Sequence, residues 1–206
     1  MQFLKEELRV KILESATVEF YNNGYGKASM REIAKQSGIT VGNIYRYFDG
    51  KEALFEAVVK EAYDRFYDIV ANGVRDELIK VTNSDSFEML RQELITSLVH
   101  CVSEKRIELL ILLRGAEGTN YANMKEDFDK VIFDKVMLHF KHSFENVGGN
   151  EHVTFIAGVI SKSCVEGLVE TIIRYDDERK LTESMEMIFE YYFLGFDDRF
   201  SKLSKK

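Results

Sequence analysis

Residues 38–48, GITVGNIYRYF, place polar and aromatic side chains together on one short predicted helix. Arg46 can form two hydrogen bonds to guanine or neutralise a phosphate, Asn43 can pair with adenine, and Val41 can touch a thymine methyl group. Gly42 would let the backbone approach a partner closely. Hydroxyl and ammonium groups suit phosphate oxygens, which fix position without reading sequence. The chain offers five such groups in this region: Ser29, Thr40, Tyr45, Tyr47 and Lys51. The chemistry expected here is binding of double-stranded DNA.

Two predicted helices precede this segment and would position it. The first spans about residues 5–23 with apolar residues on one face, and Gly24 after it suits a left-handed cap. Ser29 begins the second with a capping box, in which its hydroxyl would accept from the Glu32 amide and the Glu32 side chain would reach back to the Ser29 amide. Gly38 ends this helix after two turns.

The third predicted helix runs from Thr40 to Phe48. Ile44 and Phe48 are four residues apart and would anchor it on the first two helices. The residues expected to receive these anchors are Phe20, Ile33 and Ala34. We expect these side chains to point away from the core: Val41, Gly42, Asn43, Arg46 and Tyr47, with Tyr45 at the border. Two short helices joined by a glycine turn and packed on a longer one form a helix-turn-helix.

A longer pattern surrounds these helices. It consists of Ile12-Leu13, Ala16, Phe20, Gly24-Tyr25, Ser29, Ile33-Ala34, Ser37-Gly38-Ile39, residues 42–48 and residues 51–54. The pattern resembles the DNA-binding domain of TetR-type (tetracycline-repressor-like) transcriptional regulators, over roughly the first 55 residues without a gap. The resemblance implies that Tyr45, Tyr47 and Lys51 hold the DNA backbone. It also implies that Val41, Gly42 and Asn43 lie closest to the bases.

Composition indicates a helical globular protein. The chain has 206 residues, 45% of them apolar and 31% charged, and it has no proline to break long helices. Apolar residues recur at spacings of three and four. We therefore predict an all-α fold of about nine helices. A three-helix DNA-binding domain with the helix-turn-helix would occupy residues 1–50, and a larger helical effector-binding and dimerisation domain would occupy residues 51–206.

The charge is unevenly distributed. The net charge of −7 at first argues against a nucleic-acid partner. Residues 1–51, however, carry eight Lys/Arg and six Asp/Glu, a net of +2, and the remainder carries −9. This asymmetry indicates a slightly basic amino-terminal module on an acidic body.

The body is large enough to enclose a small-molecule effector between its helices. Aromatic, apolar and methionine side chains at helical spacing could line such a pocket, although they also form ordinary cores. The candidates are Tyr63, Phe66, Tyr67, Phe87, Leu109, Leu113, Glu117, Tyr121, Met124, Phe128, Cys164 and Leu168. Glu117, Glu166 and Glu170 are the polar candidates; a buried carboxylate among them would favour a cationic ligand, and the alternative is that all three are simply exposed.

The last two predicted helices suit a two-fold four-helix dimer interface, which the resemblance also implies. Small residues would permit close helix approach, and the final helix is more apolar than one core face needs. The candidate interface residues are Ala157, Gly158, Ser161, Gly167, Phe189, Tyr192 and Phe193.

We predict a homodimeric, DNA-binding repressor that a small-molecule effector releases from a palindromic operator. One alternative is a regulator of the same fold controlled by a protein partner or by no ligand. Another is a helical enzyme or interaction module without DNA binding. The chain has no common catalytic or phosphate-loop motif, so we expect no enzyme activity, cofactor or metal site. The start, MQFLKEEL, is no signal peptide, no membrane span is indicated, and two cysteines in apolar helical runs fit the cytoplasm.

Overall fold

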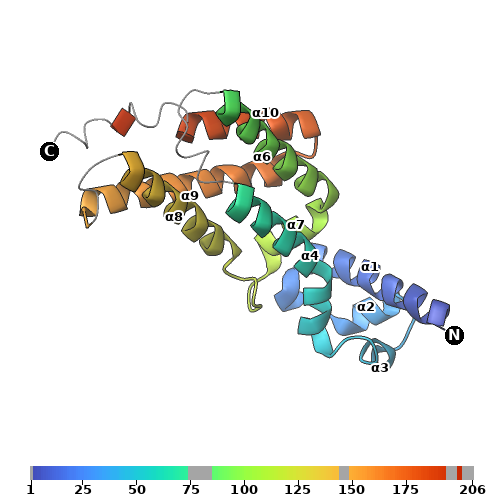
Figure 1. Cartoon of the computed structure of the whole chain (residues 1–206). Coiled ribbons are helices and arrows are strands. Elements are labelled where there is room, and N and C mark those ends of the chain that lie inside the picture. Colours follow the sequence, from blue (N-terminus) through green and yellow to red (C-terminus); the bar gives the residue numbers. More distant parts are fainter. Residues whose placement is uncertain (1, 74–84, 144–148, 194–198, 201–206) are drawn as a thin grey trace. The chain divides into compact units, whose positions relative to one another are not determined.

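The computed structural model describes the backbone of residues 2–73, 85–143, 149–193 and 199–200 (Figure 1). Within these ranges the regular structure is helical and contains no strand, which confirms the predicted all-α fold. The described residues form nine helices: α1 (Gln2–Lys27), α2 (Met30–Gln36), α3 (Val41–Ile44), α4 (Gly50–Gly73), α6 (Asp85–Glu104), α7 (Arg106–Gly115), α8 (Met124–Ser143), α9 (Glu151–Arg174) and α10 (Glu178–Phe193).

The chain divides into two compact units. The first contains Met1–Arg65 and Lys105–Met124, and the second contains Phe66–Glu104 and Lys125–Lys206. The helix-turn-helix region therefore belongs to a unit that also includes most of α4 and all of α7, whereas the functional domain expected from the sequence ends at residue 50. In the part of the chain with a described structure, no helix combines the length and apolar character needed to cross a membrane.

A glycine contact joins α1 to α7 inside the first unit. Gly24 has φ 67° and ψ 169°, so the expected left-handed residue is present, but it kinks α1 and the helix continues to Lys27. A Cβ atom added to Gly115 would lie only 2.7 Å from the Gly24 Cα atom. Since real Cβ atoms do not approach so closely, this backbone crossing requires glycine at position 115.

Aromatic rings fill the core of the first unit. Phe20 and Phe55 are almost fully buried, and their ring centroids lie 5.0 Å apart in an edge-to-face arrangement. Tyr25 adds a ring 5.2 Å from Phe55. Such pairs stabilise a core beyond the area that they bury. This cluster holds the turn after the α1 kink against α4.

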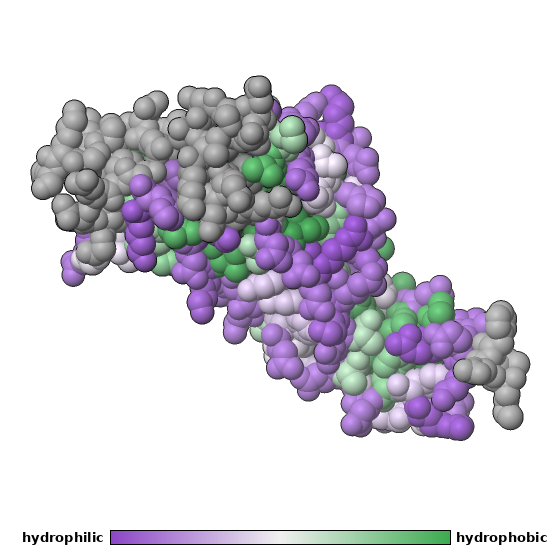
Figure 2. Space-filling model, viewed as in Figure 1, coloured by the Kyte–Doolittle hydropathy of each residue, from purple (hydrophilic) through white to green (hydrophobic). Residues whose placement is uncertain are grey.

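The second unit combines an apolar core with a few polar links between helices. Arg91 on α6 is buried and donates hydrogen bonds to Glu88 and to Glu190 on α10. Ser161 on α9 donates a hydrogen bond to Asp129 on α8. These links fix the pairing of α6 with α10 and of α8 with α9. Figure 2 shows hydrophobic residues reaching the visible surface in places among hydrophilic ones.

Candidate nucleic-acid interface

The start of α2 is fixed by two acceptors. The Ser29 hydroxyl accepts from the Arg31 amide at 3.3 Å, and the Glu19 carboxylate accepts from the Ser29 amide at 2.9 Å. Ser29 is therefore the N-cap, as predicted, but both partners in the predicted capping box are wrong: the hydroxyl accepts from the Arg31 amide and not the Glu32 amide, and Glu19, not Glu32, accepts from the Ser29 amide. Glu32 instead forms an exposed ion pair with Lys35 at 3.5 Å, because Glu19 of α1 already occupies the position beside the Ser29 amide.

Helix α3 is shorter than predicted. Thr40 is its N-cap, as expected, and its hydroxyl accepts from the Asn43 amide at 3.3 Å. Regular helix ends at Ile44. The Arg46 and Tyr47 amides then bond three residues back, to Asn43 and Ile44 respectively, so the predicted last turn is a series of tight turns.

Two apolar anchors hold this segment down. Ile44 is fully buried and Phe48 nearly so, as predicted, and the residues expected to receive them, Phe20, Ile33 and Ala34, are buried as well. The sequence did not indicate that the Arg9 guanidinium lies over the Phe48 ring, 5.5 Å from its centroid. A cation above an aromatic face adds a favourable electrostatic contact. The anchors thus fix which face of α3 remains open.

The open face carries most of the side chains expected on it. Thr40, Gly42, Tyr45 and Arg46 are exposed. Half-buried residues make up the remainder: Ser29, Val41, Asn43, Tyr47 and Lys51. The expectation that Tyr45 lies at the border is wrong, since 55% of Tyr45 is exposed and Tyr47 takes the border position. The structure brings these groups together on one unit, around α3 and the starts of α2 and α4.

Gly42 is not required by the packing of the chain itself. A Cβ atom built there would meet only the Thr40 Oγ1 atom, at an ordinary 3.9 Å. Its backbone is not in the left-handed region either, where glycine would be favoured. Glycine weakens a helix by about 1 kcal/mol relative to alanine. A residue that costs stability and serves no internal contact is best explained by close approach of a partner.

Lys51, near the start of α4, contacts the turn that follows the α1 kink. Its ammonium donates to the Gly26 carbonyl at 3.3 Å and lies 4.7 Å from the centroid of the Tyr25 ring. Burial lowers the pKa of Lys51, and the negative charge of Glu19 opposes that effect. Glu19 and Tyr25 were not identified as site residues from the sequence, because a spacing pattern does not show contacts between separate helices.

The residues predicted to line an effector pocket are divided between the two units. Six lie in the first unit: Tyr63, Leu109, Leu113, Glu117, Tyr121 and Met124. Six lie in the second unit: Phe66, Tyr67, Phe87, Phe128, Cys164 and Leu168. Several pack against one another, with ring centroids 5.0 Å apart for Tyr63–Tyr121 and 5.2 Å apart for Phe66–Phe128. The side chain of Phe87 lies outside the described residues.

The carboxylates considered for a cationic ligand are exposed. Glu117 lies on the connection between α7 and α8, Glu166 pairs with Lys125 at 3.0 Å, and Glu170 lies 3.8 Å from Arg174. Of the two possibilities left open by the sequence, the structure shows the simpler one, in which all three carboxylates are exposed. Solvent hydrates each of them because it faces outward from its helix or loop.

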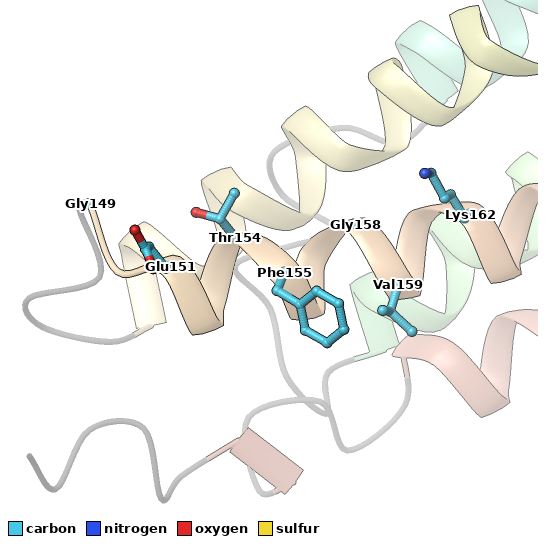
Figure 3. A pocket seen from close by; sticks show the side chains of 7 residues that line it. All are labelled: Gly149, Glu151, Thr154, Phe155, Gly158, Val159 and Lys162. Atoms are coloured by element: carbon cyan, nitrogen blue, oxygen red, sulfur yellow. The ribbon is translucent and has the colours of Figure 1, made fainter.

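An open hollow of about 520 Å³ lies along α9 (Figure 3). It is lined by Gly149, Glu151, Thr154, Phe155, Gly158, Val159 and Lys162. Phe155 and Val159 project from the same side of the helix. None of the predicted effector-pocket residues borders this hollow. The hollow lies along α9, the helix that the sequence analysis expected to contribute to the dimer interface.

Three of the candidate dimer residues pack within the single chain. Ala157 and Ser161 are fully buried. A Cβ atom on Gly167 would come within 3.3 Å of Ile188, so this glycine lets α10 approach α9. Of the rest, Gly158 borders the hollow, and Phe189, Tyr192 and Phe193 are half-buried on α10. The exposed apolar side chains of the two helices are others: Phe155, Val159, Met187 and Tyr191.

Comparison with known proteins supports one family. A family model described as bacterial regulatory proteins, tetR family, matches residues 12–58. The probable HTH-type transcriptional regulator YttP of Bacillus subtilis (strain 168) is 40% identical over 63 residues, which are 31% of this chain and 30% of that protein. The chain thus matches about a third of the length of the first curated relatives.

Solved structures match over most of the chain. A TetR-like transcriptional regulator from Rhodococcus sp. RHA1 superposes with a TM-score of 0.59 at 15% identity, covering 88% of this chain and 92% of that one. FadR of Bacillus subtilis, a transcriptional regulator solved in complex with stearoyl-CoA, gives a TM-score of 0.53 at 17% identity and covers 91% and 99%. At these identities the structures establish the fold.

Proposed function

Because residues 12–58 match the tetR family of bacterial regulatory proteins and most of the chain has the fold of TetR-like regulators, we propose that the chain is a DNA-binding transcriptional regulator of that family. The observation that carries the proposal is the open face of α3. Ile44 and Phe48 hold the segment down, Arg46 is exposed, and Gly42 serves no internal contact. A helix presented in this way fits the major groove, where Arg46 and Asn43 read base edges.

The surrounding hydroxyl and ammonium groups bind the phosphates on either side of that groove. Thr40 and Tyr45 are exposed beside α3, and Ser29, Tyr47 and Lys51 are half-buried around it. Phosphate contacts of this kind fix the register of a protein on the duplex. The amino terminus of α2 adds backbone amides and dipole charge for the same purpose.

The functional unit is a homodimer. Exposed apolar residues on α9 and α10 support pairing through these helices, with Phe155, Gly158 and Val159 on the α9 face. Two recognition helices about 34–36 Å apart meet successive major grooves on one side of the duplex. The operator is therefore palindromic, and the protein acts as a repressor in the cytoplasm, where the chromosome is accessible.

A small-molecule effector controls DNA binding. The stearoyl-CoA complex of FadR supports this class of ligand for the fold. In one conformation of the dimer, the spacing of the two recognition helices would not match the half-sites of the operator. An effector that binds this conformation more tightly would lower the population of dimers that can bind the operator. Titrating stearoyl-CoA and a panel of other hydrophobic molecules into the protein–DNA complex tests this step. Release by one of them supports an effector, and retention with all of them favours control by a protein partner or by no ligand.

The DNA-binding proposal is tested by selecting duplexes from a random library with the full chain. We expect enriched sequences with two inverted half-sites about 10 base pairs apart and two chains bound per duplex. Selection of no common sequence would contradict the proposal. A common sequence without inverted symmetry would retain DNA binding and contradict the dimeric arrangement.

A further inference from the structure

Glu19 is a buried carboxylate that the proposed DNA contacts do not use. It lies on α1 with 6% of its surface exposed, and it is the only buried acidic side chain among the residues whose burial is described. A carboxylate is rarely buried unless hydrogen bonds or an opposite charge compensate for lost hydration. Two groups compensate Glu19 for its lost hydration: the Ser29 amide, which donates a hydrogen bond to it, and the positive charge of Lys51. Both residues are proposed to bind phosphate.

The first feature is the start of α2. The Glu19 Oε1 atom accepts from the Ser29 amide at 2.9 Å, although ten residues separate the two in sequence. Ser29 is the N-cap residue of α2, where amides lack helical partners and negative charge is favourable. Glu19 therefore ties the amino terminus of α2 to α1.

The second feature is the set of contacts that hold the Lys51 ammonium in place. The ammonium of Lys51 contacts the Gly26 carbonyl and the Tyr25 ring, both in the turn that runs from the α1 kink to Ser29. The Ala28 amide bonds to the Gly24 carbonyl at 3.1 Å and fixes one end of this turn. The bond between Glu19 and Ser29 fixes the other end. The negative charge of Glu19 also favours the charged form of Lys51, against the larger effect of burial.

We propose that Glu19 is a positioning residue for DNA binding. Its hydrogen bond holds Ser29 and, through the turn at residues 25–28, the Lys51 ammonium where each meets a phosphate. This inference rests on the proposed function, since it requires Ser29 and Lys51 to bind DNA. The charge of Glu19 repels phosphates while its hydrogen bond assists their binding. These two effects have opposite signs and can be separated by substitution.

The experiment compares Glu19→Gln with Glu19→Leu. Both variants lose the same charge, but only glutamine keeps an oxygen that can accept from the Ser29 amide. Affinity for the selected duplex is measured by fluorescence anisotropy at fixed salt, with active protein determined by stoichiometric titration. We expect the leucine variant to bind about threefold to tenfold more weakly than the glutamine variant, the size typical of coupled neighbours. Equal affinity of the two variants would overturn the proposal.

The same pair is then measured in a Lys51→Gln background. We expect the difference between the leucine and glutamine variants to shrink at least about twofold, because one of the two positioned groups is gone. An undiminished difference would overturn the role, since general loss of structure weakens binding equally in both backgrounds. Glu14, an exposed acid on the same helix, provides the matched control. Glu14→Gln and Glu14→Leu should bind alike, and a difference between them as large as that at Glu19 would also overturn the role.

The outcomes also separate this inference from the proposed function. If the wild-type chain selects no duplex, or if Lys51→Gln leaves its affinity unchanged, the proposed contacts themselves fail. If both of those results are as expected and the Glu19 variants bind alike, only the positioning role fails. Thermal unfolding of each variant confirms that the measurements are made on folded protein.

Discussion

Arg46, two residues after the end of α3, is the exposed side chain of this segment that is best suited to read a base. Replacing Arg46 by alanine removes two potential hydrogen bonds to guanine in each half-site, so the free energy of binding the selected duplex should weaken by about 1–3 kcal/mol per half-site. Discrimination at one base pair per half-site should relax as well. Repeating the duplex selection with the variant measures both effects.

The control for this variant is Arg174→Ala, an exposed arginine near the end of α9 whose neighbour Glu170 lies 3.8 Å away. Its affinity should stay within about twofold of the wild type, because an exposed pair contributes little. Equal weakening of selected and random duplexes by Arg46→Ala would assign Arg46 to a phosphate and contradict the base contact.

At the scale of residues, sequence patterns predicted which side chains of the candidate site are buried. They did not predict all of the hydrogen-bond partners that hold the site in place. The anchors Ile44 and Phe48 follow from helical spacing, and both are buried. The partner of the Ser29 amide does not follow from spacing. The local pattern indicates Glu32, three residues on, but the kink at Gly24 folds α1 back and brings Glu19 to the amide instead. Only the tertiary arrangement distinguishes these two acids.

At the scale of helices, the crossing of α1 and α7 depends on two glycines. Gly115→Ala would place a Cβ atom 2.7 Å from the Gly24 Cα atom, so it should lower the free energy of unfolding by about 1–3 kcal/mol. Gly26→Ala, in the last turn of α1, meets nothing within 4 Å. It should instead leave stability unchanged or raise it by up to about 1 kcal/mol.

Urea unfolding followed by circular dichroism measures both variants. The tight crossing is supported if the free energy of unfolding falls in Gly115→Ala and rises in Gly26→Ala, or if Gly26→Ala is the more stable variant by at least about 1 kcal/mol. Equal stability of the two variants would show that the helices can separate without cost and would contradict it.

Helix α9 shows why the interface was harder to predict from sequence than the fold. Apolar or small residues occur on most of its faces, so helical spacing alone does not distinguish the buried face from the outer one. The structure uses Ala157 and Ser161 inside the chain and leaves Phe155 exposed. The positions of helices could be predicted because proline is absent and the breaks coincide with glycine and polar residues. Which face packs inward depends on neighbouring helices.

At the scale of the whole molecule, dimer formation through α9 should be sensitive to a charge on its exposed face. Phe155 is 67% exposed, and Phe155→Glu should convert the dimer to monomers at micromolar concentration, because a dimer would bury the new carboxylates. Val18→Glu, at a 50% exposed position on α1, should remain dimeric. Sedimentation velocity distinguishes the species, and an unaltered Phe155→Glu dimer would place the interface elsewhere.

The charge distribution of the whole molecule also bears on DNA binding. With +2 on residues 1–51 and −9 on the rest, long-range attraction to DNA is weak, and affinity has to come from close contacts. Such contacts release counterions, so their number can be read from the dependence of affinity on salt.

The most direct test of the central claim is the salt dependence of affinity for the selected duplex. We predict that the wild-type dimer loses about a thousandfold in affinity between 50 and 200 mM salt, as six or more phosphate contacts require. The double variant Tyr47→Ala, Lys51→Ala should weaken binding and reduce the slope of log affinity against log salt by about two, because each chain loses one cationic phosphate contact, that of Lys51. A shallow wild-type slope, or an unchanged slope in the double variant, would contradict binding of DNA through this face.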